Sequence, residues 1–94
     1  PNVYYYRDSA QGRAAAEIFA NNLKLIYPYP ELVKIVPTTT LVGLRRTKAP
    51  AVLVEVAYHD NVDDANWITS NIEPIAENLS LSLADVLGVP FVEI

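Results

Sequence analysis

Glu55 is the side chain of this sequence whose surroundings most clearly call for a chemical explanation. It stands within residues 51–56, AVLVEV, where the other five residues are Ala, Val or Leu, a pattern typical of a strand covered on both faces. Because burying an unpaired carboxylate is costly, Glu55 must be exposed at a sheet edge, be paired with a cation, or be held with a raised pKa for a task. A strand-end glutamate, or one satisfied by structural partners, is the alternative to a catalytic residue.

The residue types that usually bind a catalytic metal are scarce in this chain. There is one histidine, His59, and no cysteine, whereas a catalytic zinc site usually takes three protein ligands from His, Asp, Glu and Cys. We interpret His59 as a solvent-exposed or hydrogen-bonded loop histidine and not as a ligand. The sequence therefore predicts no metal site made by this chain alone.

The segments around Glu55 resemble the zinc-dependent N-acetylmuramoyl-L-alanine amidases, the peptidoglycan hydrolases of bacteria and their phages. Three segments, which together extend over most of the chain, carry the resemblance: LRRTKAPAVLVEVAYHDN, SAQGRAAAEIFANNL and NIEPIAENLSLSLADVLGVPFV. The most specific matching positions are Leu44, Arg45, Thr47, Pro50, residues 52–55 and Asn61.

The resemblance implies that Glu55 is the catalytic acid/base beside a zinc ion. In this family the zinc polarises the amide carbonyl between N-acetylmuramic acid and L-alanine and lowers the pKa of its bound water to about 7. Glu55 would take the proton from that water and pass it to the leaving amine. Arg45 would bind a substrate carboxylate or the oxyanion through its planar guanidinium, although a solvated loop arginine or an ion-pair partner is the competing interpretation. Asn61 matches an asparagine of the family and also suits a helix cap or an Asx turn.

Two motifs that hold the zinc in this family are missing. The family binds its metal through two histidines and a glutamate, the first histidine in a D-P-G-H-G-type turn, and neither histidine motif occurs here. We therefore expect the 94 residues to be the C-terminal half of an amidase catalytic domain, with zinc bound only in the complete domain. The isolated chain would then be inactive. The complete protein would act outside the cell or in the cell wall, as a bacterial or phage-encoded lysin.

Composition and charge exclude several other classes of protein. The apolar content of 51% and the charged content of 19% indicate a globular chain. The formal charge of −4, with one tight basic group at Arg45, Arg46 and Lys48, argues against a nucleic-acid partner. Without cysteine no disulfide can form. No apolar run approaches the roughly 20 residues that a membrane helix needs, so we expect no membrane insertion.

Strand and helix patterns alternate along the sequence, which predicts an α/β fold with a mainly parallel sheet and flanking helices. Strands are expected at residues 3–7, 33–36 and 51–58, with Tyr4 and Tyr6 on the face opposite Tyr5. The tyrosines could stack on sugar rings, although an aromatic strand more often packs within a core.

Three helices are expected between and after these strands. The first begins at an N-cap Asp8, with Gln11 as capping-box partner, and ends before Pro28 and Pro30. The second is a short helix capped by Asp60 or Asn61, and the third runs from near Ser70 or Asn71 to Gly88. The apolar face of the first helix comprises Ala15, Ile18, Phe19, Leu23 and Ile26, together with Asn22. The apolar stripe of the third comprises Ile72, Ile75, Ala76, Leu79, Leu83 and Leu87.

A non-catalytic fragment or self-associating α/β module is the second function that the sequence allows. A sheet divided after its metal-binding strands would leave strand 3–7 or 51–58 without its neighbour and an apolar helix stripe facing water. Pairing with a second copy is the commonest way to cover such surfaces. Peptidoglycan, the N-terminal half of the domain and a second copy are therefore the expected partners.

Overall fold

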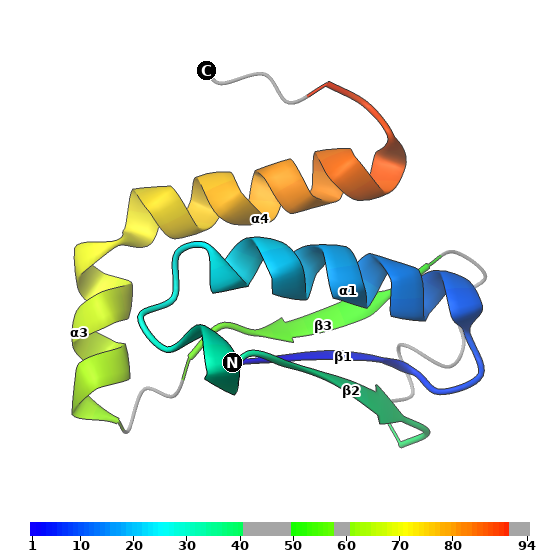
Figure 1. The fold of residues 1–94 in the computed structure, drawn as a ribbon, viewed down its shortest axis with the longest axis horizontal. Coiled ribbons are helices and arrows are strands. Elements are labelled where there is room, and N and C mark those ends of the chain that lie inside the picture. Colours follow the sequence, from blue (N-terminus) through cyan, green and yellow to red (C-terminus); the bar gives the residue numbers. More distant parts are fainter. Residues whose placement is uncertain (41–49, 58–60, 91–94) are drawn as a thin grey trace.

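The computed structural model describes residues 1–40, 50–57 and 61–90. Along the chain the elements are β1 (Asn2–Tyr6), α1 (Ala10–Lys24), the 3-10 helix η1 (Pro30–Leu32), β2 (Lys34–Thr38), β3 (Val52–Glu55), α3 (Val62–Ser70) and α4 (Ile72–Leu87). The strands form one sheet, α1 lies across it, and α4 packs on α1 on the side away from the sheet (Figure 1). Among the described residues no helix is both long and apolar enough to cross a membrane.

The sheet is mixed, with the strand order β2-β1-β3. β1 is parallel to β2, to which α1 connects it, and antiparallel to β3. The predicted α/β class is therefore confirmed, but the prediction of a mainly parallel sheet is wrong. A helical crossover makes the two strands that it joins parallel, and this rule applies to β1 and β2. β3 runs in the direction opposite to both β1 and β2.

β1 is the central strand, and its two faces have different surroundings. Val3 and Tyr5 are buried, whereas Tyr4 and Tyr6 on the opposite face are partly exposed, which confirms the predicted alternation. The core cluster lies between β1 and α1 and comprises Val3, Tyr5, Ala16, Phe19, Ala20, Leu23, Tyr27 and Val33. Since β1 has a partner on each side, the expectation that strand 3–7 lacks a neighbour is wrong. β3 has one neighbour among the described residues.

The two outer strands begin and end at other residues than the sequence predicted. β2 continues two residues beyond Val36, through Pro37. Proline is tolerated there because β2 is an edge strand, whose outward side needs no N–H. β3 is shorter than the predicted strand, and Tyr58 at the end of that prediction lies outside the described residues.

Ser9 caps α1, and the predicted cap at Asp8 is wrong. The Ser9 hydroxyl accepts a hydrogen bond from the backbone N–H of Gly12 at 2.8 Å, with Ser9 in an extended conformation. The Asp8 carboxylate instead accepts a hydrogen bond from the Tyr6 hydroxyl at 3.1 Å. The glycine at position 12 permits this close approach, because a Cβ there would lie 3.0 Å from the Ser9 Oγ. At its other end α1 stops at Lys24, before Pro28, as predicted.

α4 ends as the sequence predicts, but only part of its predicted apolar stripe, Ile75 and Leu79, packs inward. Gly88 closes the helix in the left-handed conformation, with φ of 68°. Four residues of the predicted apolar stripe face solvent: Ile72, Leu83 and Leu87 are 63%, 52% and 64% exposed, and Ala76 is also exposed. The buried residues are Ile75, Asn78, Ser82 and Ala84.

Hydrogen bonds to α1 determine which face of α4 is buried. The Asn78 amide donates to the backbone carbonyl of Asn22 at 2.9 Å. The Asn22 amide in turn donates to the Ser82 hydroxyl at 3.0 Å and to the Asp85 carboxylate at 3.2 Å. The polar residues Asn78 and Ser82 of α4 thus face α1, whereas Leu83 and Leu87 face solvent. The buried Asn78 Oδ1 accepts no hydrogen bond from the described residues.

We expect Ser9→Ala to lower the free energy of unfolding by about 1 kcal/mol, because the Gly12 N–H loses its side-chain acceptor. Urea denaturation followed by circular dichroism measures this change. Asp8→Ala is the matched control and should change stability by less than about 0.5 kcal/mol, since Asp8 is exposed and caps no helix. A larger loss for Asp8→Ala than for Ser9→Ala would contradict the assignment of the cap.

Candidate functional site on the open face of the sheet

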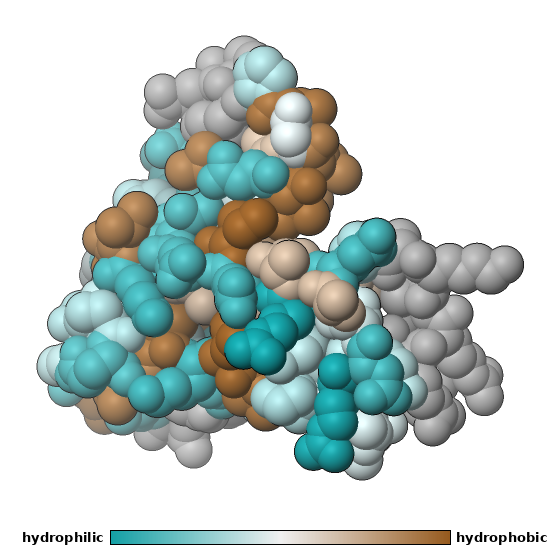
Figure 2. Space-filling view, turned by 45° about the vertical axis from the view of Figure 1, so that its right-hand side comes forward, coloured by the Kyte–Doolittle hydropathy of each residue, from teal (hydrophilic) through white to brown (hydrophobic). Residues whose placement is uncertain are grey.

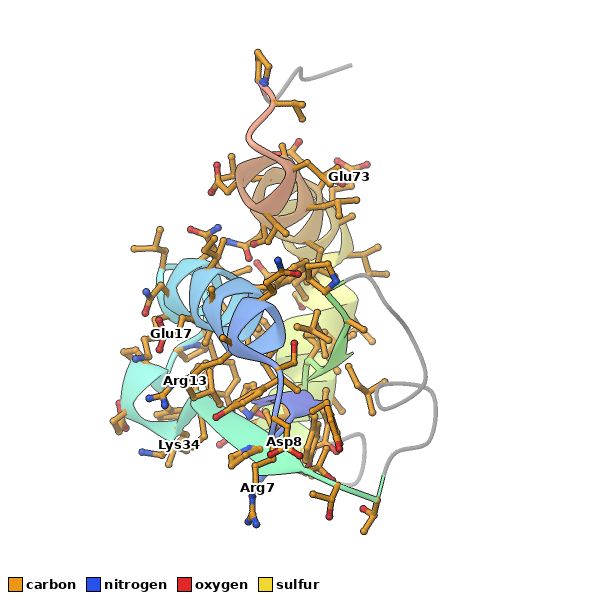
Figure 3. All side chains as sticks on the ribbon, turned by 90° about the vertical axis from the view of Figure 1, so that its right-hand side faces the viewer. Arg7, Asp8, Arg13, Glu17, Lys34 and Glu73 are labelled. Carbon is orange, nitrogen blue, oxygen red and sulfur yellow. The ribbon has the colours of Figure 1, made fainter. Side chains whose placement is uncertain are left out.

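One face of the sheet is covered by α1, and we call the opposite face the open face. Side-chain alternation along the strands places Asn2, Tyr4 and Tyr6 of β1 on it, beside Leu53 and Glu55 of β3. α1 is the described helix that packs against all three strands, and it lies on the other side (Figure 3). Leu53 is consequently 49% exposed. The open face is thus the accessible part of the sheet.

Glu55 is the last residue of β3 and lies opposite Asn2 of β1. The Asn2 side-chain amide donates to Glu55 Oε1 at 3.2 Å and to the Tyr4 hydroxyl oxygen at 3.3 Å. Within the described residues no lysine or arginine forms an ion pair with Glu55. The sequence allowed Glu55 to be exposed at a sheet edge, paired with a cation, or held with a raised pKa. In the structure it lies on an edge strand, partly buried, with a neutral amide as its partner.

This geometry orients the Glu55 carboxylate and leaves one of its oxygens open to the accessible face. One carboxylate oxygen is held by Asn2, while Oε2 accepts no hydrogen bond from the residues that the structure describes. A general base must be positioned by its neighbours and must reach the proton that it abstracts. Glu55 is held by Asn2 and faces the accessible side of the sheet.

The other residues singled out in the sequence do not join Glu55 in the structure. Arg45 and His59 lie outside the described residues. Asn61 is the N-cap of α3, and its Oδ1 accepts from the backbone N–H of Asp64 at 3.1 Å, which confirms the capping interpretation. Asn2 and Tyr4 were not identified from the sequence as neighbours of Glu55. Their spacing of two residues in a strand was visible, but the pairing of that strand with residues 52–55 was not.

The described residues do not fit a catalytic zinc site. In residues 1–40, 50–57 and 61–90 no three side chains of His, Cys, Asp or Glu come together as a metal would need. The hydrogen-bond partner of Glu55 is a neutral amide. What the open face offers by itself is therefore an accessible carboxylate held by a neutral amide.

A second polar pair lies buried beneath aromatic rings. The Tyr27 hydroxyl donates to Asp64 Oδ1 at 2.6 Å, and these residues are 6% and 4% exposed. The Trp67 ring meets the Tyr27 ring edge to face, with centroids 5.1 Å apart, and Tyr29 makes a similar contact at 5.9 Å. Burial, together with the hydrogen bond and the negative charge of Asp64, raises the pKa of Tyr27 well above its usual value.

The Tyr27–Asp64 pair positions α3 against the rest of the fold. Tyr27 follows α1, and Asp64 lies in the first turn of α3, so the bond joins segments 37 residues apart. α3 follows β3 in the chain, and it lies at the end of the sheet where β1 begins and β3 ends (Figure 1). The pair therefore stabilises the end of the sheet that carries Glu55.

Comparison of the chain with protein-family models, with curated proteins and with solved structures finds no match. Function must therefore be inferred from the residues of this chain and their geometry. The oriented carboxylate of Glu55 on an accessible sheet face is the feature from which that inference starts.

We expect Tyr27→Phe to lower the free energy of unfolding by about 1–3 kcal/mol, because Asp64 loses a hydrogen-bond donor in buried surroundings. Tyr29→Phe, which keeps the ring contact and removes a hydroxyl from a partly exposed ring, should cost less than about 0.5 kcal/mol. Urea denaturation at neutral pH measures both. Equal losses for the two variants would contradict the role of the buried pair.

The same pair predicts how pH changes the difference in the free energy of unfolding between wild type and Tyr27→Phe. Because the pKa of Tyr27 is higher in the folded protein, the folded state retains the phenol proton more strongly than the unfolded state. This stabilisation is fully present below the unfolded pKa of about 10 and is lost as the pH rises through the folded value. The stability advantage of the wild type should therefore shrink above about pH 10.

Proposed function

We propose that this chain supplies the catalytic glutamate of a peptidoglycan amidase, which hydrolyses the amide between N-acetylmuramic acid and L-alanine. The observation that carries the proposal is Glu55, which is oriented by the Asn2 amide on the accessible face of the sheet. The resemblance of residues 44–61 to the amidase family adds the substrate and the reaction. The complete enzyme would act in the cell wall or outside the cell.

Glu55 acts in this proposal as the group that transfers the proton. Its carboxylate takes a proton from the attacking water and delivers it to the nitrogen of L-alanine, while the C–N bond breaks and a carboxylate remains on the lactyl group. Asn2 holds the carboxylate so that Oε2 faces the substrate. Tyr4 and Leu53 lie beside this pair on the open face and offer partly exposed apolar surface to a sugar ring.

The remaining parts of an amidase site would come from outside the described residues. Zinc, which the resemblance implies, would need ligands from outside the described residues, among which no three His, Cys, Asp or Glu side chains come together. Arg45 would contact a carboxylate of the stem peptide, as the resemblance implies. The role proposed for Glu55 requires that the attacking water lie within hydrogen-bonding reach of its carboxylate.

We expect Glu55→Gln, made in the complete domain, to reduce cell-wall lysis by a factor of about 10²–10⁴, since glutamine cannot transfer the proton. The fold should persist, because the glutamine carbonyl can still accept the bond from Asn2. Turbidity loss of purified cell walls measures the rate, and elemental analysis should find the zinc content unchanged.

Glu73→Gln is the matched control for this experiment. It removes the same charge from an exposed position on α4, away from the sheet (Figure 3). It should leave the lysis rate within a factor of about two, as expected for a surface change remote from the site. More than about a tenth of wild-type turnover in Glu55→Gln would refute the catalytic assignment.

A self-associating module without hydrolase activity is the second candidate function, and exposed apolar side chains favour it. Leu83, Leu87 and Val89 are half exposed or more on and just after α4. Apolar side chains gather along this part of the molecule in the space-filling view (Figure 2). Contiguous apolar surface of this kind is often an interface.

We expect the 94-residue chain to self-associate through α4, because pairing two copies would remove these leucines from water. Sedimentation velocity across a hundredfold concentration range measures the association. The double variant Leu83→Ser, Leu87→Ser should shift the chain toward monomer, whereas Leu25→Ser, which removes an exposed leucine near the end of α1, should not. A wild-type chain that sediments as a 10.4 kDa monomer throughout would contradict this second function.

A further inference from the structure

A groove of about 440 Å³ lies between α1 and β2, on the side of the molecule away from β3. Its floor is made by Ala20, Val33 and Ile35, of which Ala20 and Val33 are each 3% exposed. Lys24 from the last turn of α1 and Lys34 from β2 border it, and both are exposed. The groove therefore combines an apolar floor with a basic rim.

The charge around this groove is opposite to that of the chain. Of the four lysines and arginines among the described residues, Lys24 and Lys34 border the groove, and a third, Arg13, pairs with a residue that lines it. That residue is Glu17, whose Oε1 lies 3.3 Å from Arg13 Nε, so its charge is partly compensated. Arg13, Glu17 and Lys34 lie on one side of the molecule (Figure 3). In a chain of formal charge −4, this groove is suited to an anionic partner.

The outer edge of β2 adds backbone hydrogen-bonding groups to the groove. Lys34 donates its N–H to Pro1, and Thr38 accepts from Arg7, so these residues direct their backbone groups toward β1. Because alternate residues of a strand bond to opposite sides, Ile35 directs its N–H and C=O outward, into the groove. Pro37, the next outward residue, has no N–H. Ile35 is thus the position at which an added strand would be paired.

We propose that this groove binds an extended acidic peptide as an additional strand along β2. One peptide residue pairs with Ile35 through both backbone groups, and its side chain rests on the apolar floor. The residues on either side of it project to the opposite face of the sheet, the face of Lys34, and the next pair returns to the face of α1 and Lys24. The preferred pattern is an apolar residue flanked on both sides by acidic ones. The site is independent of the proposed amidase function, because β1 separates it from Glu55.

The acetylated, amidated pentapeptide Glu-Glu-Val-Glu-Glu tests this proposal on the 94-residue chain. The peptide is expected to add as an antiparallel strand, because only in that arrangement does a single residue exchange both backbone hydrogen bonds with Ile35. Titration followed by ¹⁵N–¹H spectra should give saturable shifts centred on the Ile35 amide. The affinity should fall as salt rises, because the ion pairs are exposed and screened.

Three matched comparisons separate the contributions of the two lysines, of a remote positive charge and of the backbone hydrogen bond to the peptide affinity. The double variant Lys24→Gln, Lys34→Gln should weaken binding at least about fivefold, from two exposed ion pairs. Arg7→Gln, which removes a positive charge away from the groove (Figure 3), should leave the affinity within about twofold. A peptide whose valine is N-methylated should bind at least about fivefold more weakly, because it cannot donate to the Ile35 carbonyl.

Several results would overturn the proposal. They are the absence of saturable shifts at Ile35, equal binding of the peptide Lys-Lys-Val-Lys-Lys, and equal weakening by Arg7→Gln and by the double lysine variant. Shifts of the same size with free glutamate or inorganic phosphate would show that the groove is a small-anion site and that no strand is added.

Discussion

Close packing of α1 against the central strand β1 is the constraint on which the rest of the structure depends. The small side chains of Ala16 and Ala20 allow the helix to approach the buried residues Val3 and Tyr5. Phe19 and Leu23 belong to the same cluster, in which Val3, Ala16 and Leu23 are fully buried. Because this single interface commits one face of the sheet to the core, the opposite face remains accessible, and the polar residues of β1 and β3 meet there.

The two sites that carry the proposed functions follow from the pairing of β1 with its two neighbours. Pairing of β1 with β3 places Asn2 opposite Glu55, so a carboxylate that looked misplaced in an apolar strand is at an accessible edge and hydrogen-bonded. Pairing of β1 with β2 leaves Ile35 directed outward beside the two lysines. One strand thus separates a candidate proton-transfer site from a candidate peptide-binding groove.

The helical layer shows how hydrogen bonding can override an apolar pattern. The leucines of α4 form a clear stripe in the sequence, but Asn22 of α1 presents an amide that needs acceptors. Satisfying it with Ser82 and Asp85 turns the helix so that Leu83 and Leu87 face solvent. Asn22 is only half-buried, whereas Asn78 of α4 is buried and its Oδ1 accepts no hydrogen bond from the described residues. The exposed stripe is the surface on which the self-association hypothesis rests.

The sequence by itself determined the local features of this protein. The α/β class, the alternation of Tyr4, Tyr5 and Tyr6, the helix ends before Pro28 and at Gly88, and the Asn61 cap all follow from interactions within a few residues. The catalytic role of Glu55, the amidase resemblance and the contribution of Arg45 remain predictions. Only the tertiary structure decided the antiparallel direction of β3, the Asn2–Glu55 and Tyr27–Asp64 bonds and the face of α4 that is buried. Those features join segments 37 to 63 residues apart, and neither hydrophobic periodicity nor local propensity records which distant polar groups will become partners.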